Sequence, residues 1–198
     1  MRFIGVTQRV GTSENRERRD QLDQRWIAFL LQCGFTPYPI PNHVRSAESL
    51  VRSIACHGIL LTGGNNLLDY GGDAPERDET ELFLLKHALD RNLPLLGICR
   101  GMQLIQHFFG IRLTQVEGHI TPTLKITVNG TEREVPSYHR MGTTETTDVL
   151  DVWAAAPDGV VKAVRHKTRP IQGLMWHPER IHPFAPPDIE FVREFYTR

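Results

Sequence analysis

The feature that most constrains the fold is an alternation of short apolar runs with longer segments of helical periodicity. The run RFIGVT (residues 2–7) predicts a buried strand, and LDQRWIAFLLQCG (residues 22–34) then repeats apolar side chains at helical spacing. The runs HGILLT (57–62) and LPLLGI (93–98) predict two further strands, each flanked by helical patterns. Strands that alternate with helices in this way form a largely parallel sheet covered on both faces.

The chain after residue 111 has a different pattern. LKITVNGTEREV carries an Asn129-Gly130 hairpin signal, and VWAAAPDGVVKAV places Asp158-Gly159 between two strand-like runs. A last strand, IQGLMW, precedes HPER, and PDIEFVREFY predicts a closing helix. We therefore expect one α/β domain over residues 1–198, with a mainly parallel central sheet and a small antiparallel β addition.

Charge and hydropathy exclude several classes of protein. Lys plus Arg and Asp plus Glu are both 23, so no overall field attracts nucleic acid or an anionic membrane. The longest apolar runs are far below the roughly 20 residues that cross a bilayer, and MRFIGVTQRV lacks the long apolar region of a signal peptide. The three cysteines are widely spaced, which suits reduced thiols. We expect a cytoplasmic protein without nucleic-acid or membrane partners.

One cysteine directly follows a predicted strand. The pattern GICRG, residues 97–101, has the form of a nucleophile elbow, a sharp strand-to-helix turn in which glycines relieve crowding. This turn lies at the carboxyl edge of the sheet, where ligands bind, and a helix N-terminus favours the nucleophilic thiolate. Cys99 is therefore the candidate nucleophile. Cys33 and Cys56 lie on apolar faces of helical patterns, so we expect them to be small buried hydrophobes.

A cysteine nucleophile needs a base, and the base needs an orienting group. His177 ends the last predicted strand, and Glu179 lies near enough in an extended chain to point the same way. The backbone N–H groups of Arg100 and Gly64 are the candidate oxyanion hole, because one follows the nucleophile and the other belongs to paired glycines after a buried strand. Taken singly, each feature also fits a solvated strand end or an ordinary glycine turn.

Taken together, GICRGMQ, TGG and WHPE, in this order and spacing, resemble the class I glutamine amidotransferase superfamily with its Cys-His-Glu triad. The resemblance covers essentially the whole chain and implies a flavodoxin-like α/β sandwich. It implies that Cys99 attacks the δ-carbonyl of a γ-glutamyl group to form a thioester, while His177 protonates the departing nitrogen and activates water. Glu179 would hold His177. By position, the residues that contact the glutamyl moiety would be Gln103, Ser137, Tyr138 and His139.

Details of the resemblance favour a stand-alone hydrolase. RDETE (77–81) and SYHR (137–140) look more like the γ-glutamyl-γ-aminobutyrate hydrolase group than like ammonia-supplying subunits. The start, FIGVTQRV with RRDQLDQRW, resembles the γ-glutamyl-CDP-amidate hydrolases of bacterial capsule phosphoramidate synthesis, which would release glutamate and cytidine diphosphoramidate. Two alternatives stay open: a γ-glutamyl-γ-aminobutyrate hydrolase, and a glutaminase subunit that supplies ammonia to a synthase. An intact triad argues against a binding module that has lost catalysis.

Contacts to the leaving group are suggested by the first strand. Arg9 follows that strand, so it lies at the same carboxyl edge as Cys99 and could hold a phosphate. Four further arginines begin or line the first helical pattern and predict a solvated face: Arg16, Arg18, Arg19 and Arg25. His139, His166 and His182 are unclustered in sequence and no Cys-x-x-Cys pair accompanies them, so we expect no metal and no cofactor. A small γ-glutamyl compound is the expected partner, without an obligatory synthase, and the oligomeric state is open.

Overall fold

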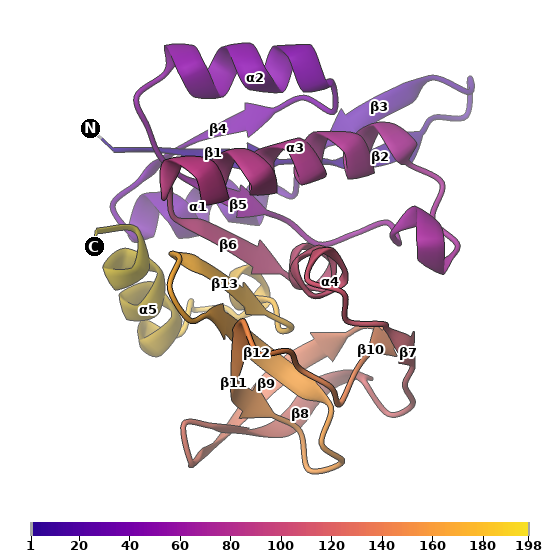
Figure 1. Ribbon diagram of the computed structural model, residues 1–198, viewed down its shortest axis with the longest axis vertical. Helices are drawn as coiled ribbons and strands as arrows, with labels where there is room; N and C mark the ends of the chain where they lie inside the picture. The colour runs from indigo at the N-terminus through magenta and orange to yellow at the C-terminus, as the bar shows by residue number, and fades with distance from the viewer. Residues whose placement is uncertain (1, 198) are drawn as a thin grey trace.

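A mixed sheet of nine strands runs through the whole molecule (Figure 1). The computed structural model describes residues 2–197. The strands of this sheet are β1 (Phe3–Thr7), β4 (Thr36–Ile40), β5 (Cys56–Leu61), β6 (Leu95–Ile98), β8 (Ile120–Val128), β9 (Thr131–Tyr138), β11 (Leu150–Ala155), β12 (Val161–His166) and β13 (Ile171–Leu174). Their spatial order is β4-β1-β5-β6-β13-β12-β11-β8-β9. The strands from β4 to β13 are parallel, and the pairs from β13 to β9 are antiparallel.

Helices cover both faces of the parallel half, as the strand–helix alternation predicts. They are α1 (Gln24–Gln32), α2 (Val44–Ser53), α3 (Pro75–Arg91), α4 (Arg100–Phe108) and α5 (Pro186–Thr197). On one face α2 packs against α3 and α3 against α4, while α1 and α5 lie together on the other (Figure 1). The Asp23 side chain accepts the backbone N–H of Arg25 and so begins α1, whose buried side chains are Trp26, Phe29 and Leu30. The α/β fold with a mainly parallel central sheet is therefore confirmed.

The antiparallel strands extend the central sheet itself, because β12 pairs with β13. Asn129 and Gly130 join β8 to β9 with φ angles of 48° and 82°, as an Asn-Gly hairpin requires. Gly159, with φ 85°, lies in the turn between β11 and β12. Two small sheets flank this one, β7 (Thr114–Gln115) with β10 (Met141–Gly142) and β2 (Arg9–Thr12) with β3 (Arg18–Gln21).

The hairpin of β2 and β3 corrects one expectation. Arg18 and Arg19 do not begin a helix but lie on β3, antiparallel to β2, and Arg16 lies in the connecting turn with φ 61°. The short strands carry too little apolar alternation to be recognised from the sequence. Arg18 pairs with Glu76 at 2.6 Å and all three arginines are exposed, so the expected solvated surface is present.

The free edge of the parallel half is β4. Its Thr36 N–H donates to the Arg2 carbonyl at 2.8 Å, and Pro37 and Pro39 stand opposite Ile4 and Val6 of β1. Prolines are tolerated at this place because an edge strand pairs on one side only. Within residues 2–197, no helix is long and apolar enough to cross a membrane.

Candidate active site

Cys99 occupies the turn between β6 and α4. Its backbone has φ 52° and ψ −102°, outside the regions that non-glycine residues favour, and its N–H donates to the Leu174 carbonyl at 2.7 Å. Strain of this kind persists where the surroundings fix the backbone, and it is the geometry of a nucleophile elbow. The side chain is thereby presented at the carboxyl edge of the sheet, at the N-terminus of α4.

Two glycines make this turn possible. A Cβ built on Gly97 would lie 2.5 Å from the Gly101 carbonyl carbon, and one built on Gly101 would lie 2.4 Å from the Leu61 carbonyl oxygen. Both neighbours are backbone atoms, which cannot move aside as a flexible side chain would. The glycines of GICRG are therefore required for α4 to pack closely against β5 and β6.

The structure brings Cys99, His177 and Glu179 together. His177 Nδ1 and Glu179 Oε1 are 2.7 Å apart, and both side chains are buried. The other side of the imidazole faces Cys99, because both side chains pack against Gly63. A Cβ built on Gly63 would lie 2.7 Å from His177 Cε1 and 3.5 Å from Cys99 Cβ. This is the arrangement of nucleophile, base and orienting group that the sequence predicted, although the catalytic roles themselves stay predictions.

The charges of this group favour a thiolate–imidazolium pair. Burial raises the pKa of the Cys99 thiol, but the charge of His177 and a hydrogen bond from its ring outweigh burial and hold this pKa below its ordinary value. Burial lowers the pKa of His177, but the charges of Cys99 and Glu179 raise it to about 9. At neutral pH the imidazole is therefore protonated, and its charge favours the thiolate of Cys99, the nucleophilic form.

The candidate oxyanion donors, Arg100 and Gly64, line the same cavity as Cys99. The Arg100 N–H hydrogen-bonds Cys99, which helps to lower the thiol pKa. Gly64 has φ 86° and lies against the Arg9 stem, where a Cβ would come within 3.1 Å of Arg9 Cδ. A residue other than glycine would be strained there. The role of these two N–H groups as an oxyanion hole remains a prediction.

The loop after β5 is held from behind by Arg77. This fully buried side chain on α3 donates to three successive carbonyls, those of Thr62, Gly63 and Gly64. A guanidinium has five N–H donors in a rigid fork, so one residue can fix the carbonyl direction of a whole turn. Since the carbonyls of this loop point to α3, the structure holds its peptide planes in one orientation.

Glu81 is the centre of this buried ion network. It pairs with Arg77 at 2.9 Å and accepts the Thr7 hydroxyl at 2.7 Å, and the Arg100 guanidinium binds both Glu81 and Asp78. Burial raises the pKa of Glu81, but the charges of Arg100 and Arg77 outweigh it and keep the carboxylate ionised. In the sequence, RDETE (77–81) indicated only a resemblance to the hydrolase group and not a buried ion network. Its Arg-x-x-x-Glu spacing on a helix was the available signal.

A cavity of about 440 Å³ opens in front of Cys99 on the side of the antiparallel strands. We call it the cysteine pocket, and its walls include Cys99, Gln103, Tyr138, His139, Arg140 and Met141. Gln103, Tyr138 and His139 therefore line the same cavity as Cys99, and their contact with a glutamyl group stays a prediction. Ser137 instead lies behind the wall, where it is buried and its hydroxyl donates to the His119 carbonyl at 2.9 Å.

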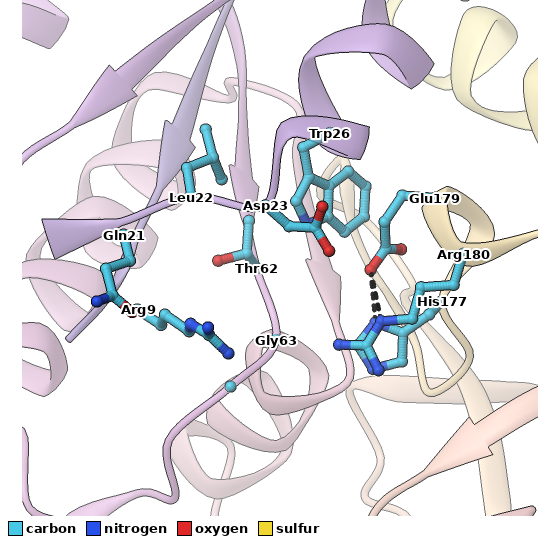
Figure 2. A pocket seen from close by; sticks show the side chains of 11 residues that line it. Arg9, Gln21, Leu22, Asp23, Trp26, Thr62, Gly63, His177, Glu179 and Arg180 are labelled. Carbon is cyan, nitrogen blue, oxygen red and sulfur yellow. Dashed lines mark hydrogen bonds and ion pairs between the residues drawn. The ribbon is translucent and has the colours of Figure 1, made fainter. Parts of the chain in front are cut away.

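A second cavity, of about 140 Å³, lies beside the β2–β3 hairpin (Figure 2). We call it the hairpin pocket, and its walls include Arg9, Gln21, Asp23, Trp26, Glu179 and Arg180. Gly64, His177 and Arg180 line both cavities, so the two pockets adjoin at the triad. Figure 2 shows the Arg9 guanidinium pointing into the space between the hairpin and His177.

Comparisons with known proteins find one family and several similar proteins. The model of the class-I glutamine amidotransferase family matches residues 19–196. A γ-glutamyl-CDP-amidate hydrolase of Campylobacter jejuni is 29% identical over 98% of each chain. A glutamine-hydrolysing GMP synthase of Francisella philomiragia is 30% identical over 76% of this chain and 28% of its own length. A solved structure from Thermoplasma acidophilum, described as that of a GMP synthase subunit, superposes with a TM-score of 0.76 at 24% identity, over 100% of this chain and 93% of that one.

Proposed function

Because this chain belongs to the class I glutamine amidotransferase family, we propose that it hydrolyses γ-glutamyl-CDP-amidate to glutamate and cytidine diphosphoramidate through a thioester on Cys99. Membership of the family makes the protein a hydrolase of amide C–N bonds. The identity of the leaving group is our proposal, supported by the similarity to the Campylobacter jejuni hydrolase along nearly the whole of both chains. The reaction would belong to capsule polysaccharide phosphoramidate synthesis in the cytoplasm.

The first half of the reaction forms the thioester. The Cys99 thiolate attacks the δ-carbonyl carbon, and the carbonyl oxygen takes up the negative charge between the N–H groups of Arg100 and Gly64. The intermediate collapses as the C–N bond breaks, and the protonated His177 gives its proton to the departing nitrogen. The raised pKa of His177 suits this role, because the residue enters the step already protonated.

The second half releases glutamate. His177, now neutral, takes a proton from water, and the resulting hydroxide attacks the thioester carbon. The C–S bond breaks, the thiolate is restored beside the imidazolium, and the γ-carboxyl of glutamate is complete. Glu179 holds the Nδ1 side of the ring at 2.7 Å throughout, so the other ring nitrogen stays directed at the reacting atoms.

The observation that carries the choice of leaving group is the hairpin pocket. Because it adjoins the cysteine pocket at Gly64 and His177, a bond cleaved between them would place the glutamyl part on one side and the departing group on the other. Arg9 and Arg180 give this second side two guanidinium groups, which suit the oxygens of phosphates. Among residues 2–197 no ion pair occupies the Arg9 guanidinium.

The size of the hairpin pocket limits what it can enclose. About 140 Å³ suits a diphosphate better than a complete nucleotide, so the nucleoside would lie towards the open mouth. Gln21 and Asp23 supply oxygen acceptors on the hairpin side of the cavity (Figure 2). Asp23 is already bonded to Arg25, which reduces its repulsion of an anion.

One purified sample tests the proposal against its competitors. We expect γ-glutamyl-CDP-amidate to be hydrolysed with a higher kcat/KM than γ-glutamyl-γ-aminobutyrate, and free glutamine to be poor, since binding energy comes from the departing group. Preference for γ-glutamyl-γ-aminobutyrate would replace the proposed substrate. Activity on glutamine only with a partner protein would show an ammonia-supplying subunit instead.

Replacement of Arg9 tests the leaving-group site directly. We expect Arg9→Ala to lower kcat/KM for the nucleotide conjugate by about 5- to 150-fold, while a small γ-glutamyl amide is hydrolysed nearly as before. Arg19→Ala is the matched control, because Arg19 lies on the same hairpin, is exposed and pairs with Glu17. An equal loss for both substrates with Arg9→Ala would place Arg9 outside the leaving-group site.

A further inference from the structure

A buried lysine lies behind the cysteine pocket. Lys162, on β12, has a relative exposure of 1%. Its Nζ lies 2.8 Å from His119 Nδ1, 2.6 Å from His139 Nε2 and 3.2 Å from the Ser137 hydroxyl oxygen. An ammonium group has three N–H donors and no acceptor, so this environment satisfies it completely.

The two histidines are held in single tautomers by their other contacts. His139 Nδ1 lies 2.9 Å from the Met141 carbonyl, which can only accept, so the ring proton is on Nδ1 and Nε2 accepts from Lys162. His119 Nε2 likewise donates to Asp158 Oδ2 at 2.9 Å, which leaves Nδ1 as an acceptor. Burial and the charge of Lys162 lower the pKa of His139 to about 3, so this ring stays neutral.

Among residues 2–197, no carboxylate contacts the ammonium group of Lys162 directly. Burial lowers the pKa of Lys162 to about 8, against the opposing charges of Asp158 and Cys99, so the ammonium is the main form at pH 7. Asp158 reaches it only through the His119 ring. A buried cation destabilises the fold relative to an apolar side chain unless its hydrogen bonds offset the cost of removing it from water. Buried charged groups of this kind cluster at functional sites, so we look for a role of Lys162 in the neighbouring pocket.

The contacts of Lys162 lead to the wall of the cysteine pocket. His139, which it binds, lines that pocket and donates to the Met141 carbonyl. The same carbonyl accepts the Gln103 side-chain N–H at 2.9 Å. Lys162 therefore fixes one end of a chain whose other members, His139, Met141 and Gln103, all line the cavity.

We propose that Lys162 is a positioning residue, whose ammonium group holds His139 and, through the Met141 carbonyl, Gln103 in the orientation that binds the glutamyl part of the substrate. The inference rests on the proposed function, which makes the cysteine pocket the glutamyl site. It assigns Lys162 to substrate binding rather than to the chemical step, because its contacts lead to the pocket wall and not to His177 or Glu179.

Lys162→Met tests this role, since methionine fills much of the same space without donors. We expect KM to rise about five- to tenfold while kcat changes less than about twofold. Iodoacetamide should still label Cys99 faster than Cys33 or Cys56, because the triad is intact. Lys167→Met is the matched control, an exposed lysine next to β12 that should leave KM unchanged. A folded Lys162→Met protein with the wild-type KM, or with a loss confined to kcat, overturns the proposal.

A second variant decides the matter if Lys162→Met does not fold. Asp158→Asn removes the charge behind His119 from a half-exposed position, and we expect KM to rise about two- to threefold with an unchanged melting temperature. An unchanged KM contradicts the inference. Calorimetry with L-glutamate separates the role of Lys162 from the proposed function. A wild-type protein that binds glutamate but hydrolyses no γ-glutamyl amide refutes only the proposed function. Weaker glutamate binding by the variant would then still support the positioning role of Lys162. A wild type that does not bind glutamate refutes the inference.

Discussion

The parallel and antiparallel halves of the sheet contribute different things to the site. Cys99, Gly64 and His177 all follow strands of the parallel half, namely β6, β5 and β13. The side chains of Tyr138 and His139, which face them across the cysteine pocket, come from the antiparallel half. The parallel half thus presents the groups proposed to react, and the antiparallel half presents a wall proposed to recognise the substrate.

The two halves also fix their side chains by different means. In the parallel half the backbone contributes directly, through the φ of 52° at Cys99 and the close approach of Gly101 to Leu61, in addition to the side-chain bonds of Arg77 and Glu179. In the antiparallel half the means are side-chain hydrogen bonds, as around Lys162. From this difference we expect substitutions around Cys99 and His177 in the parallel half to lower kcat, and substitutions around Lys162 in the antiparallel half to raise KM.

The largest effect that the comparison predicts is at the nucleophile. Cys99→Ala should lower turnover by at least about a thousandfold with the fold intact, because no other group can form the thioester. Cys33→Ala is the control: Cys33 is buried between α1 and the rest of the core, so its loss should act on stability alone. Steady-state hydrolysis by the purified variants measures this. Near-normal turnover by the Cys99→Ala variant would contradict the proposed thioester mechanism.

The next effect separates the base from its orienting group. His177→Ala should be nearly as damaging as Cys99→Ala, since His177 exchanges protons with both the leaving group and water. Glu179→Gln should lower kcat less, because an amide still occupies the position beside Nδ1 but no longer stabilises the imidazolium. Rates at saturating substrate would show the order. A larger loss from Glu179→Gln than from His177→Ala would contradict these roles.

A smaller effect is expected from a methyl group at the elbow. Gly101→Ala should destabilise the fold by about 1–3 kcal/mol and lower kcat, because the new Cβ meets the Leu61 carbonyl oxygen at 2.4 Å. Gly118→Ala is the matched change in the antiparallel half: its φ is 77° but nothing lies within 4 Å, so roughly 1 kcal/mol of strain is expected without a change in kcat. Urea unfolding and kinetics of both variants distinguish a site effect from simple destabilisation.

The smallest effect concerns the pH dependence of alkylation. Iodoacetamide reacts with thiolates, so its reaction with Cys99 should accelerate as pH rises through the lowered pKa and then level off. In the His177→Ala variant the pKa of Cys99 should rise, so labelling at pH 7 should slow and the increase of the labelling rate should move to higher pH. Cys33, whose pKa burial raises to about 12, should remain unlabelled over the same range. Mass spectrometry that found Cys33 or Cys56 labelled first would contradict an activated Cys99.

Much of the fold was predictable because its signals are local. Helical periodicity, the Asn129-Gly130 turn and the GICRG pattern each lie within a short window, and the order of motifs brought Cys99 and His177 to one edge of the sheet. What escaped prediction depends on distant partners. Lys162 sits in the apolar run VVKAV, and nothing in that run identifies the acceptors at His119 and His139.

The same reason explains why the ion network was missed. The spacing of Arg77 and Glu81 indicates a pair on a helix, but a helix surface offers many such pairs in water. Only the folded chain shows that this pair is buried and that Arg100 joins it. The β2–β3 hairpin, which forms a wall of the hairpin pocket, was likewise too short and too polar to be recognised.

The prolines of β4 have a consequence for how this chain behaves at high concentration. Since the Thr36 N–H faces β1, the backbone nitrogens of Pro37 and Pro39, one and three residues further on, face outward at the free edge. An approaching strand from another molecule would find no donors there, so edge-to-edge sheet growth is blocked at this side. At the opposite edge β9 carries the exposed Glu132 and Glu134, whose charges oppose the same kind of aggregation.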